Sequence, residues 1–115
     1  MRIRCLVCAD GASAGHPQGK QRTPLTRVPL HHLTPMERQV FAALYSGPSN
    51  EELAARLHIT PRTVKFHIVN LRTKLGGLTR LRLHLLAALE RLELPAVCPA
   101  CARLLAEPAG LAQCA

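Results

Sequence analysis

The fold is decided by the stretch Thr60-Pro61-Arg62-Thr63-Val64-Lys65-Phe66-His67-Ile68-Val69-Asn70-Leu71-Arg72-Thr73-Lys74-Leu75-Gly76. Thr60 can accept hydrogen bonds from the first unpaired amides of a helix, and Pro61 suits the first helical position because no hydrogen bond is lost there. Gly76 and the glycine after it can take the left-handed conformation that ends a helix. The stretch therefore predicts one helix between Thr60 and Gly76.

This predicted helix has two chemically different sides. An apolar stripe repeats at helical spacing and consists of Val64, Ile68, Leu71 and Leu75. The other faces contain basic and amide side chains and no carboxylate, namely Arg62, Lys65, His67, Asn70, Arg72 and Lys74. A helix with one buried stripe and a basic outer surface is suited to lie against phosphates. We therefore expect a recognition helix that enters the major groove of DNA.

The overall composition also favours a polyanionic partner. Fifteen Lys and Arg residues stand against seven Asp and Glu residues. Two Phe and one Tyr are too few for a surface that stacks single-stranded bases. The first residues lack the pattern of a signal peptide, and charged residues interrupt the leucine-rich stretch near Leu81 well before ~20 apolar residues. We expect a soluble, cytoplasmic protein that does not contact a membrane.

Capping patterns predict further helices on both sides of the basic one. Thr34-Pro35-Met36-Glu37 and Ser49-Asn50-Glu51-Glu52 both have the spacing of a capping box. The first of these helices should end at Gly47-Pro48, and the second should be short. A fourth helix is expected from near Thr79 to about Leu92. The order of helix, short helix, tight turn and basic helix is typical of a helix-turn-helix protein.

Six blocks of sequence, in this order, are Leu33-Thr34-Pro35-Met36-Glu37-Arg38-Gln39-Val40, Gly47-Pro48-Ser49-Asn50-Glu51-Glu52-Leu53-Ala54, Leu57-His58-Ile59-Thr60, Thr63-Val64-Lys65-Phe66-His67, Lys74-Leu75-Gly76 and Arg80. Together they resemble the LuxR-type, or GerE-like, helix-turn-helix domain. The resemblance implies a four-helix DNA-binding domain of bacterial transcription regulators, usually dimeric through its last helix. It also implies that Thr63, Lys65 and the neighbouring exposed positions face the major groove and its phosphates.

The expected DNA contacts all lie in the basic helix. They are Arg62, Thr63, Lys65, Phe66, His67, Val69, Asn70, Arg72 and Lys74. Asn70 could read a base edge. Two positions depart from the family pattern: Val69 stands where many relatives have a polar or basic residue on the groove side, and Gly77 replaces the usual Val. Base readout should therefore be weaker, or depend more on Asn70 and Lys65.

The fourth helix has more leucine than one face of a small bundle needs. The predicted interface of a homodimer consists of Leu81, Leu85, Leu89 and Leu92. The fold class is therefore all-α, and we divide the chain into three parts. Residues 1–32 form a flexible N-terminal extension, residues 33–93 the helix-turn-helix domain, and residues 94–115 a C-terminal extension.

Two C-x-x-C pairs, which are not typical of the family, flank the predicted helices. Cys5 with Cys8 and Cys98 with Cys101 can supply the four thiolates of a tetrahedral, structural zinc site that holds one ion. The interval between the pairs exceeds the roughly 15–20 residues of a zinc ribbon, but it spans a domain whose ends could lie side by side. We expect this site to tie the extensions together beneath the domain, away from the basic helix, with Cys114 not needed.

Several alternatives stay open at this point. The cysteines could instead bind an iron–sulfur cluster, form a redox couple or remain reduced thiols, whereas a stable disulfide does not suit a reducing cytosol. The function that we predict is sequence-specific binding of double-stranded DNA by a small bacterial transcription regulator. The alternatives are a zinc-stabilised module that binds another regulator or RNA polymerase through the fourth helix, and a regulator that senses redox state. No catalytic motif is present, so we do not expect an enzyme.

Overall fold

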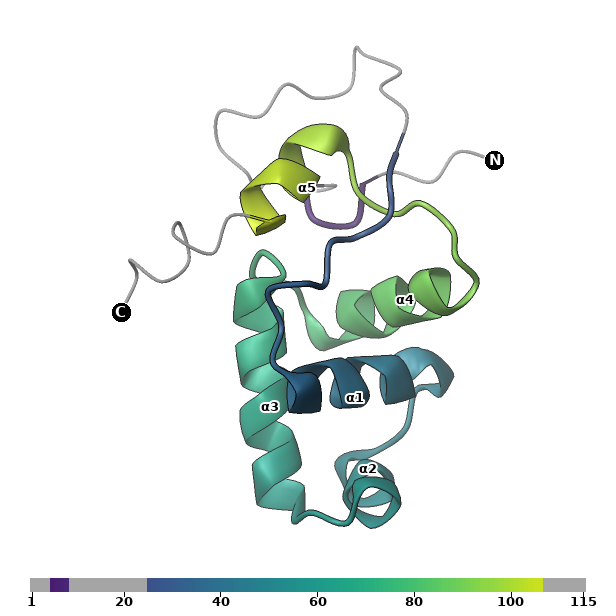
Figure 1. Ribbon diagram of the computed structural model, residues 1–115. Coiled ribbons are helices and arrows are strands. Elements are labelled where there is room, and N and C mark those ends of the chain that lie inside the picture. Colours follow the sequence, from purple (N-terminus) through teal and green to yellow (C-terminus); the bar gives the residue numbers. More distant parts are fainter. Residues whose placement is uncertain (1–4, 9–24, 107–115) are drawn as a thin grey trace.

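A computed structural model describes residues 5–8 and 25–106, and the structural statements below refer to these residues (Figure 1). The helices are α1 (Pro35–Ala43), the 3-10 turn η1 (Leu44–Ser46), α2 (Asn50–Leu57), α3 (Pro61–Lys74), α4 (Arg80–Arg91) and α5 (Pro99–Ala106). The described part of the chain contains no strand, which confirms the all-α prediction. None of the helices described has both the length and the apolar character needed to cross a lipid bilayer.

The helices begin where the capping patterns predict. The Thr34 hydroxyl accepts a hydrogen bond from the Glu37 N–H at 3.1 Å, and the Thr34 N–H donates to Glu37 Oε1 at 2.9 Å. Ser49 and Glu52 form the same reciprocal pair at 3.1 and 2.8 Å. The Thr60 hydroxyl caps α3 by accepting an amide hydrogen bond from its first turn at 3.1 Å. Both predicted capping boxes and the predicted start of the basic helix are confirmed.

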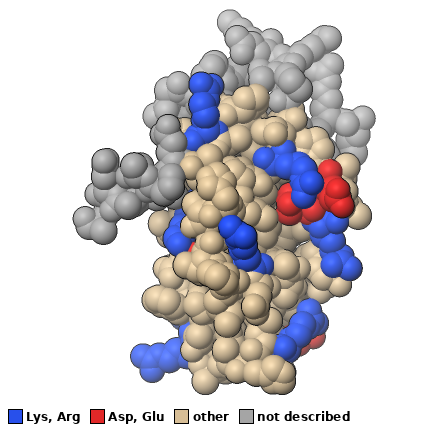
Figure 2. All heavy atoms as spheres, viewed as in Figure 1, with Lys and Arg blue, Asp and Glu red and all other residues tan. Residues whose placement is uncertain are grey.

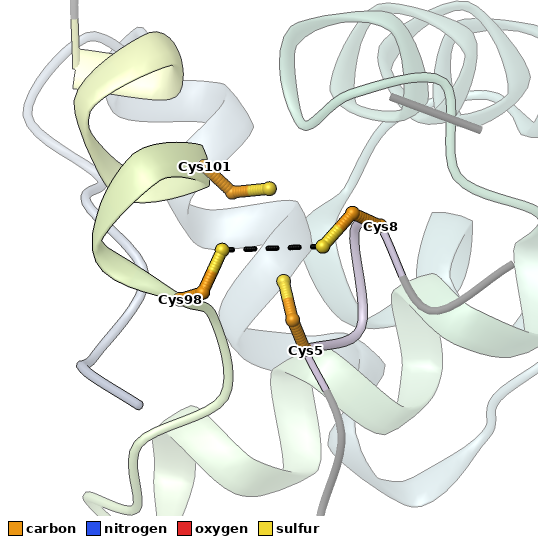
Figure 3. A group of neighbouring side chains, drawn as sticks. All are labelled: Cys5, Cys8, Cys98 and Cys101. Carbon is orange, nitrogen blue, oxygen red and sulfur yellow. Dashed lines mark hydrogen bonds between the residues drawn. The ribbon is translucent and has the colours of Figure 1, made fainter. Parts of the chain in front are cut away.

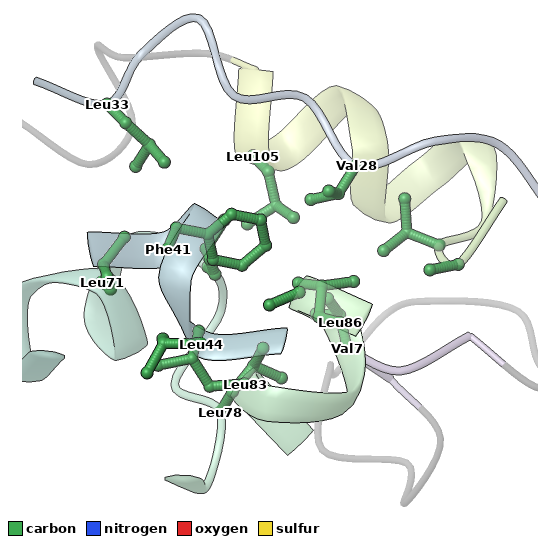
Figure 4. Packing of buried hydrophobic residues seen from close by; sticks show 14 of the residues in the cluster. Val7, Val28, Leu33, Phe41, Leu44, Leu71, Leu78, Leu83, Leu86 and Leu105 are labelled. Atoms are coloured by element: carbon green, nitrogen blue, oxygen red, sulfur yellow. The ribbon is translucent and has the colours of Figure 1, made fainter. Parts of the chain in front are cut away.

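The core lies between α1, α3, α4 and the turn η1 (Figures 1 and 4). The apolar stripe of α3 is buried there at Val64, Ile68, Leu71 and Leu75. The other helices contribute Val40, Phe41, Leu44, Leu83 and Leu86 to the same cluster. Burial of this stripe fixes the rotation of α3 about its own axis. It therefore also determines which residues of α3 face outward.

A buried carboxylate links α1 to the C-terminal end of α3. Glu37 Oε1 accepts a hydrogen bond from Lys74 Nζ at 2.8 Å in addition to the bond from Thr34. Burial opposes ionisation of Glu37, but the Lys74 ammonium and the Thr34 amide outweigh it and lower the pKa of this carboxyl below its ordinary value. Glu37 is therefore charged at neutral pH and binds the two helices together.

Parts of both predicted extensions pack against the helices. The Thr26 N–H donates to Val97 O at 2.6 Å, and the Thr26 carbonyl accepts from the Val97 N–H at 3.0 Å. The Leu6 N–H donates to Ala96 O at 3.0 Å, and Val28 and Val97 are buried in the common core. Residues 9–24, which make up half of the predicted flexible extension, lie outside the described residues.

Candidate nucleic-acid interface and metal centre

The turn between α2 and α3 determines the position of α3 relative to α2. His58 ends α2 in the left-handed conformation with φ of 58°, and the Ile59 N–H donates to Ala54 O at 3.1 Å. Ile59 packs against the core, so this short turn is anchored at its centre. The start of α3 lies beside α2, at the end of the molecule opposite to α5 (Figure 1).

The outward side of α3 contains the residues predicted to contact DNA. Arg62, Lys65, Phe66, Val69 and Arg72 are exposed, whereas Thr63, His67, Asn70 and Lys74 are half-buried. No carboxylate is present in α3. Figure 2 shows basic side chains spread over the visible face of the molecule, with acidic side chains gathered mainly in one place. The outward side of α3 is thus positively charged and accessible.

The basic residues at the two ends of α3 differ in their hydrogen bonds and ion pairs. At the C-terminal end, Lys74 pairs with Glu37, and Arg72 Nε donates to Leu78 O at 2.7 Å. In the first two turns, Arg62 and Lys65 form no hydrogen bond or ion pair with any residue that the structure describes. The sequence pattern did not distinguish these ends, because the partners of Arg72 and Lys74 come from other segments.

The four leucines predicted for a dimer interface fall into two groups. Leu81, Leu85 and Leu92 are exposed, whereas Leu89 is half-buried and packs against the core. Leu81 and Leu85 line a shallow, mainly apolar groove between η1 and α4, in which Tyr45 is the aromatic residue. Leu81 and Leu85 are therefore the exposed leucines within α4, and Leu92 follows directly after its end.

The two C-x-x-C pairs meet in one buried cluster (Figure 3). The sulfur atoms of Cys5, Cys8, Cys98 and Cys101 all lie within 4.8 Å of one another, and the Cys8 and Cys98 sulfurs are 3.9 Å apart. Tetrahedral zinc with Zn–S bonds of about 2.3 Å needs sulfurs about 3.8 Å apart. A small contraction of the cluster would therefore produce a four-thiolate metal site, and these cysteines can hold a metal ion together.

Backbone contacts bring the two pairs together. Pro99 begins α5, which places Cys98 just before the helix and Cys101 in its first turn. The strand-like pairing of Thr26 with Val97 holds the residue before Cys98, and Leu6, between the first two cysteines, is bonded to Ala96. The cluster is thus built by segments at both ends of the described chain, as the cysteine spacing predicts.

The protonation of the thiols also fits a metal site. Burial raises the pKa of Cys8 to about 12 and raises that of Cys101 even more strongly. Burial acts in the same direction on Cys5, but hydrogen bonds from the backbone amides of Cys98, Cys8 and Val7 outweigh it and lower the pKa of that thiol. The backbone therefore stabilises the thiolate of Cys5, whereas Cys8 and Cys101 need a nearby cation before they lose their protons.

The loop that carries Cys5 and Cys8 contacts the turn that ends α3, at the end of this helix opposite to its start. Gly76 and Gly77 have φ of 94° and 75°, as predicted for the end of this helix. A methyl group on Gly76 would lie 2.7 Å from Cγ1 of Val7 and 3.9 Å from Cδ2 of Leu105, whereas one on Gly77 would meet no atom within 4 Å. Val7 lies between the first two cysteines, so the loop that carries them packs against the turn after α3.

Known proteins match the helical part of the chain. Residues 31–87 match the family described as bacterial regulatory proteins, luxR family. Over 52 residues the chain is 48% identical to a protein of Hyphomicrobium methylovorum named "Probable transcriptional regulatory protein SgaR", which covers 45% of this chain and 25% of that protein. Over 51 residues it is 43% identical to Mb0914c of Mycobacterium bovis and Rv0890c of Mycobacterium tuberculosis, both named as HTH-type transcriptional regulators.

The matches cover only part of this chain and a small part of each relative. The chain spans a quarter of SgaR, and the two mycobacterial matches cover 44% of this chain and 6% of each relative. The matched segment 31–87 includes α1, α2, α3 and most of α4, and it leaves out all four clustered cysteines. No solved structure matches the chain significantly.

Proposed function

Because residues 31–87 belong to the LuxR family of bacterial regulatory proteins, we propose that the protein binds double-stranded DNA in the cytoplasm and regulates transcription. The observation that supports this function best is the two-sided helix α3: one side is locked in the core, and the other is basic, exposed and free of carboxylates. Such a surface attracts phosphates and fits the major groove. The similarity to named regulators also supports the prediction that the protein is not an enzyme.

In this proposal the first half of α3 provides most of the affinity. Arg62 and Lys65 neutralise phosphates, while Thr63, His67 and Asn70 lie at positions that reach phosphates or base edges. Arg72 and Lys74 contribute less, because their side chains already bond to Leu78 O and Glu37. Of the nine predicted contact residues, those near the start of the helix therefore contribute most to DNA binding.

Replacing both Arg62 and Lys65 with Ala should weaken binding on most DNA sequences, by roughly ten- to a hundredfold at low salt. If each residue neutralises one phosphate, the slope of log affinity against log salt should fall by about 0.9 per residue. Fluorescence anisotropy with a random-sequence duplex over a series of salt concentrations measures both effects.

Arg103→Ala is the matched control, since it removes one exposed positive charge from α5 at the opposite end of the molecule. It should leave the affinity and the salt dependence nearly unchanged. A folded Arg62/Lys65 double variant that binds as tightly as the original protein would show that α3 is not the DNA-binding surface.

The cysteine cluster supports a second proposal, a single structural zinc ion held by Cys5, Cys8, Cys98 and Cys101. Four thiolates close the coordination sphere and leave no position for a reactive water. The four residues are only 1–7% exposed, which favours a structural metal over a thiol sensor, because oxidants react with accessible thiolates. An iron–sulfur cluster would need the same four ligands and would be recognised by its visible absorption.

We further propose that α4 forms a homodimer through its exposed leucines. Leu81→Glu should give a folded monomer that binds a palindromic site more weakly, because a charge would be placed in the apolar contact. Sedimentation velocity at several protein concentrations measures the oligomeric state. Leu104→Glu, which changes an exposed leucine on α5, is the control and should not alter it.

If the original protein stays monomeric at high concentration and still binds a palindrome tightly, the dimer proposal is wrong. The exposed leucines of α4 would then suit a different partner, such as another regulator or RNA polymerase. That outcome would leave DNA binding by α3 unaffected.

A further inference from the structure

The recognition helix has a second apolar strip, on the side that faces solvent. Phe66 is 62% exposed and Val69 is 49% exposed, and their spacing of three residues places them on one face of α3. Thr73 continues this face by one turn, and its hydroxyl donates to Val69 O at 3.0 Å, so it is turned back onto the helix backbone. The strip contributes little to the core, which takes its α3 residues from the opposite side.

The surroundings of the strip indicate what could cover it. Arg62 and Lys65 lie on its N-terminal side, Arg72 lies near its C-terminal end, and no carboxylate interrupts α3. A protein partner would have to match this unbroken positive charge, whereas duplex DNA does so with its phosphates. In the major groove of DNA, the apolar group on a base edge is the C5-methyl group of thymine.

We propose that Phe66 and Val69 are specificity-determining residues that contact thymine methyl groups. The rings of Phe66 and His67 meet edge to face at 5.6 Å between centroids, an arrangement that favours a defined position for the Phe66 ring. Asn70 follows Val69, and an asparagine side chain can pair with the adenine of an A·T pair. The recognition half-site therefore contains A·T pairs where the middle of α3 lies.

This inference rests on the proposed DNA binding and names the bases that α3 reads. It changes the meaning of Val69, whose apolar side chain at first suggested weaker base readout. A valine cannot donate hydrogen bonds to bases, but it can discriminate thymine from cytosine or uracil by contact with a methyl group.

The test begins by selecting binding sites from a random pool of duplexes with the full chain. Each thymine of the selected site is then replaced with deoxyuridine, which removes the methyl group and keeps the base-pairing edge. At one or two positions in each half-site, loss of the methyl should weaken binding about fourfold, as expected for burial of one methyl-sized group. Competition anisotropy at constant salt measures the ratio of affinities for thymine and uracil.

Two variants test whether the strip of Phe66 and Val69 causes the preference for thymine over uracil. Val69→Ala should reduce the preference for thymine over uracil at one position and leave the salt dependence unchanged. Lys65→Ala is the matched control: it should weaken binding and flatten the salt dependence while the thymine preference stays. Circular dichroism confirms that each variant is folded, which is expected because both side chains are exposed.

The possible results distinguish a failure of the methyl-contact inference from a failure of the proposed DNA binding. If a site is selected but thymine and uracil bind equally at every position, or if Val69→Ala keeps the full preference, the methyl-contact inference is wrong while the DNA-binding function stands. If no sequence is selected and no duplex binds at any salt concentration, the proposed function itself fails, and the strip would then be a surface for a protein partner.

Discussion

Replacing Cys98 and Cys101 together with Ser is expected to abolish zinc binding and to lower the free energy of unfolding by about 3 kcal/mol or more. Zinc binding to structural sites of this type contributes roughly 10 kcal/mol or more, and part of it is lost to ordering the chain. The loss should loosen the segments around Val7, Val97 and Leu105, which join the core beside the cluster. Metal analysis of the purified protein and urea unfolding measure the two effects.

Helices α1 to α4 should survive this change in mild conditions, because their shared core does not require the cysteines. Cys114→Ser is the control: this residue lies outside the described part of the chain, and the variant should keep one zinc ion per protein. If the purified protein is brown and absorbs visible light, an iron–sulfur cluster and not zinc occupies the site. A metal-free protein whose double variant unfolds like the original would show that the cluster does not stabilise the fold.

Gly76→Ala should be the most damaging change in the turn that follows α3, with a loss of about 2–4 kcal/mol. Alanine is strained at the φ of 94° found there, which costs about 1 kcal/mol or more. Its methyl group would also lie 2.7 Å from Cγ1 of Val7, and such overpacking costs about 1–3 kcal/mol. Urea unfolding of the zinc-loaded variants measures the loss.

Gly77→Ala provides a matched comparison in the next position. Its φ of 75° imposes similar strain, but an added methyl group would meet nothing within 4 Å, so only about 1 kcal/mol should be lost. In the Gly76→Ala background, Val7→Ala should restore part of the stability, which is a non-additive effect. Equal losses at the two glycines would mean that the first cysteine pair does not pack on this turn.

The elements that the sequence predicted well are those with local signals. The capping residues Thr34, Ser49 and Thr60 act within one helical turn, so their patterns locate the starts of α1, α2 and α3 without knowledge of the fold. The meeting of the cysteine pairs was also predictable, because a C-x-x-C pair commonly needs a second pair to complete a metal site.

The features that the sequence did not predict depend on contacts between distant segments. Nothing in the spacing of Lys74 indicates that it would pair with Glu37, which has a complete local role in its capping box. The pairing of Thr26 with Val97 uses backbone groups alone, so side-chain composition contains no signal for it. Periodicity likewise identified the leucines of α4 but did not separate Leu89, which packs against the core, from the exposed Leu81.

The joining of residues 5–8 to residues 98–101 has a topological consequence. With a metal ion bound, the polypeptide between the two cysteine pairs is a closed ring, and it stays a ring when the helices melt. A ring of roughly 90 residues has fewer unfolded conformations than an open chain, a difference of about 4.6 kcal/mol for a covalent closure of this length. Metal loading would thus speed the return of the helices to their native packing, independently of any contact with DNA.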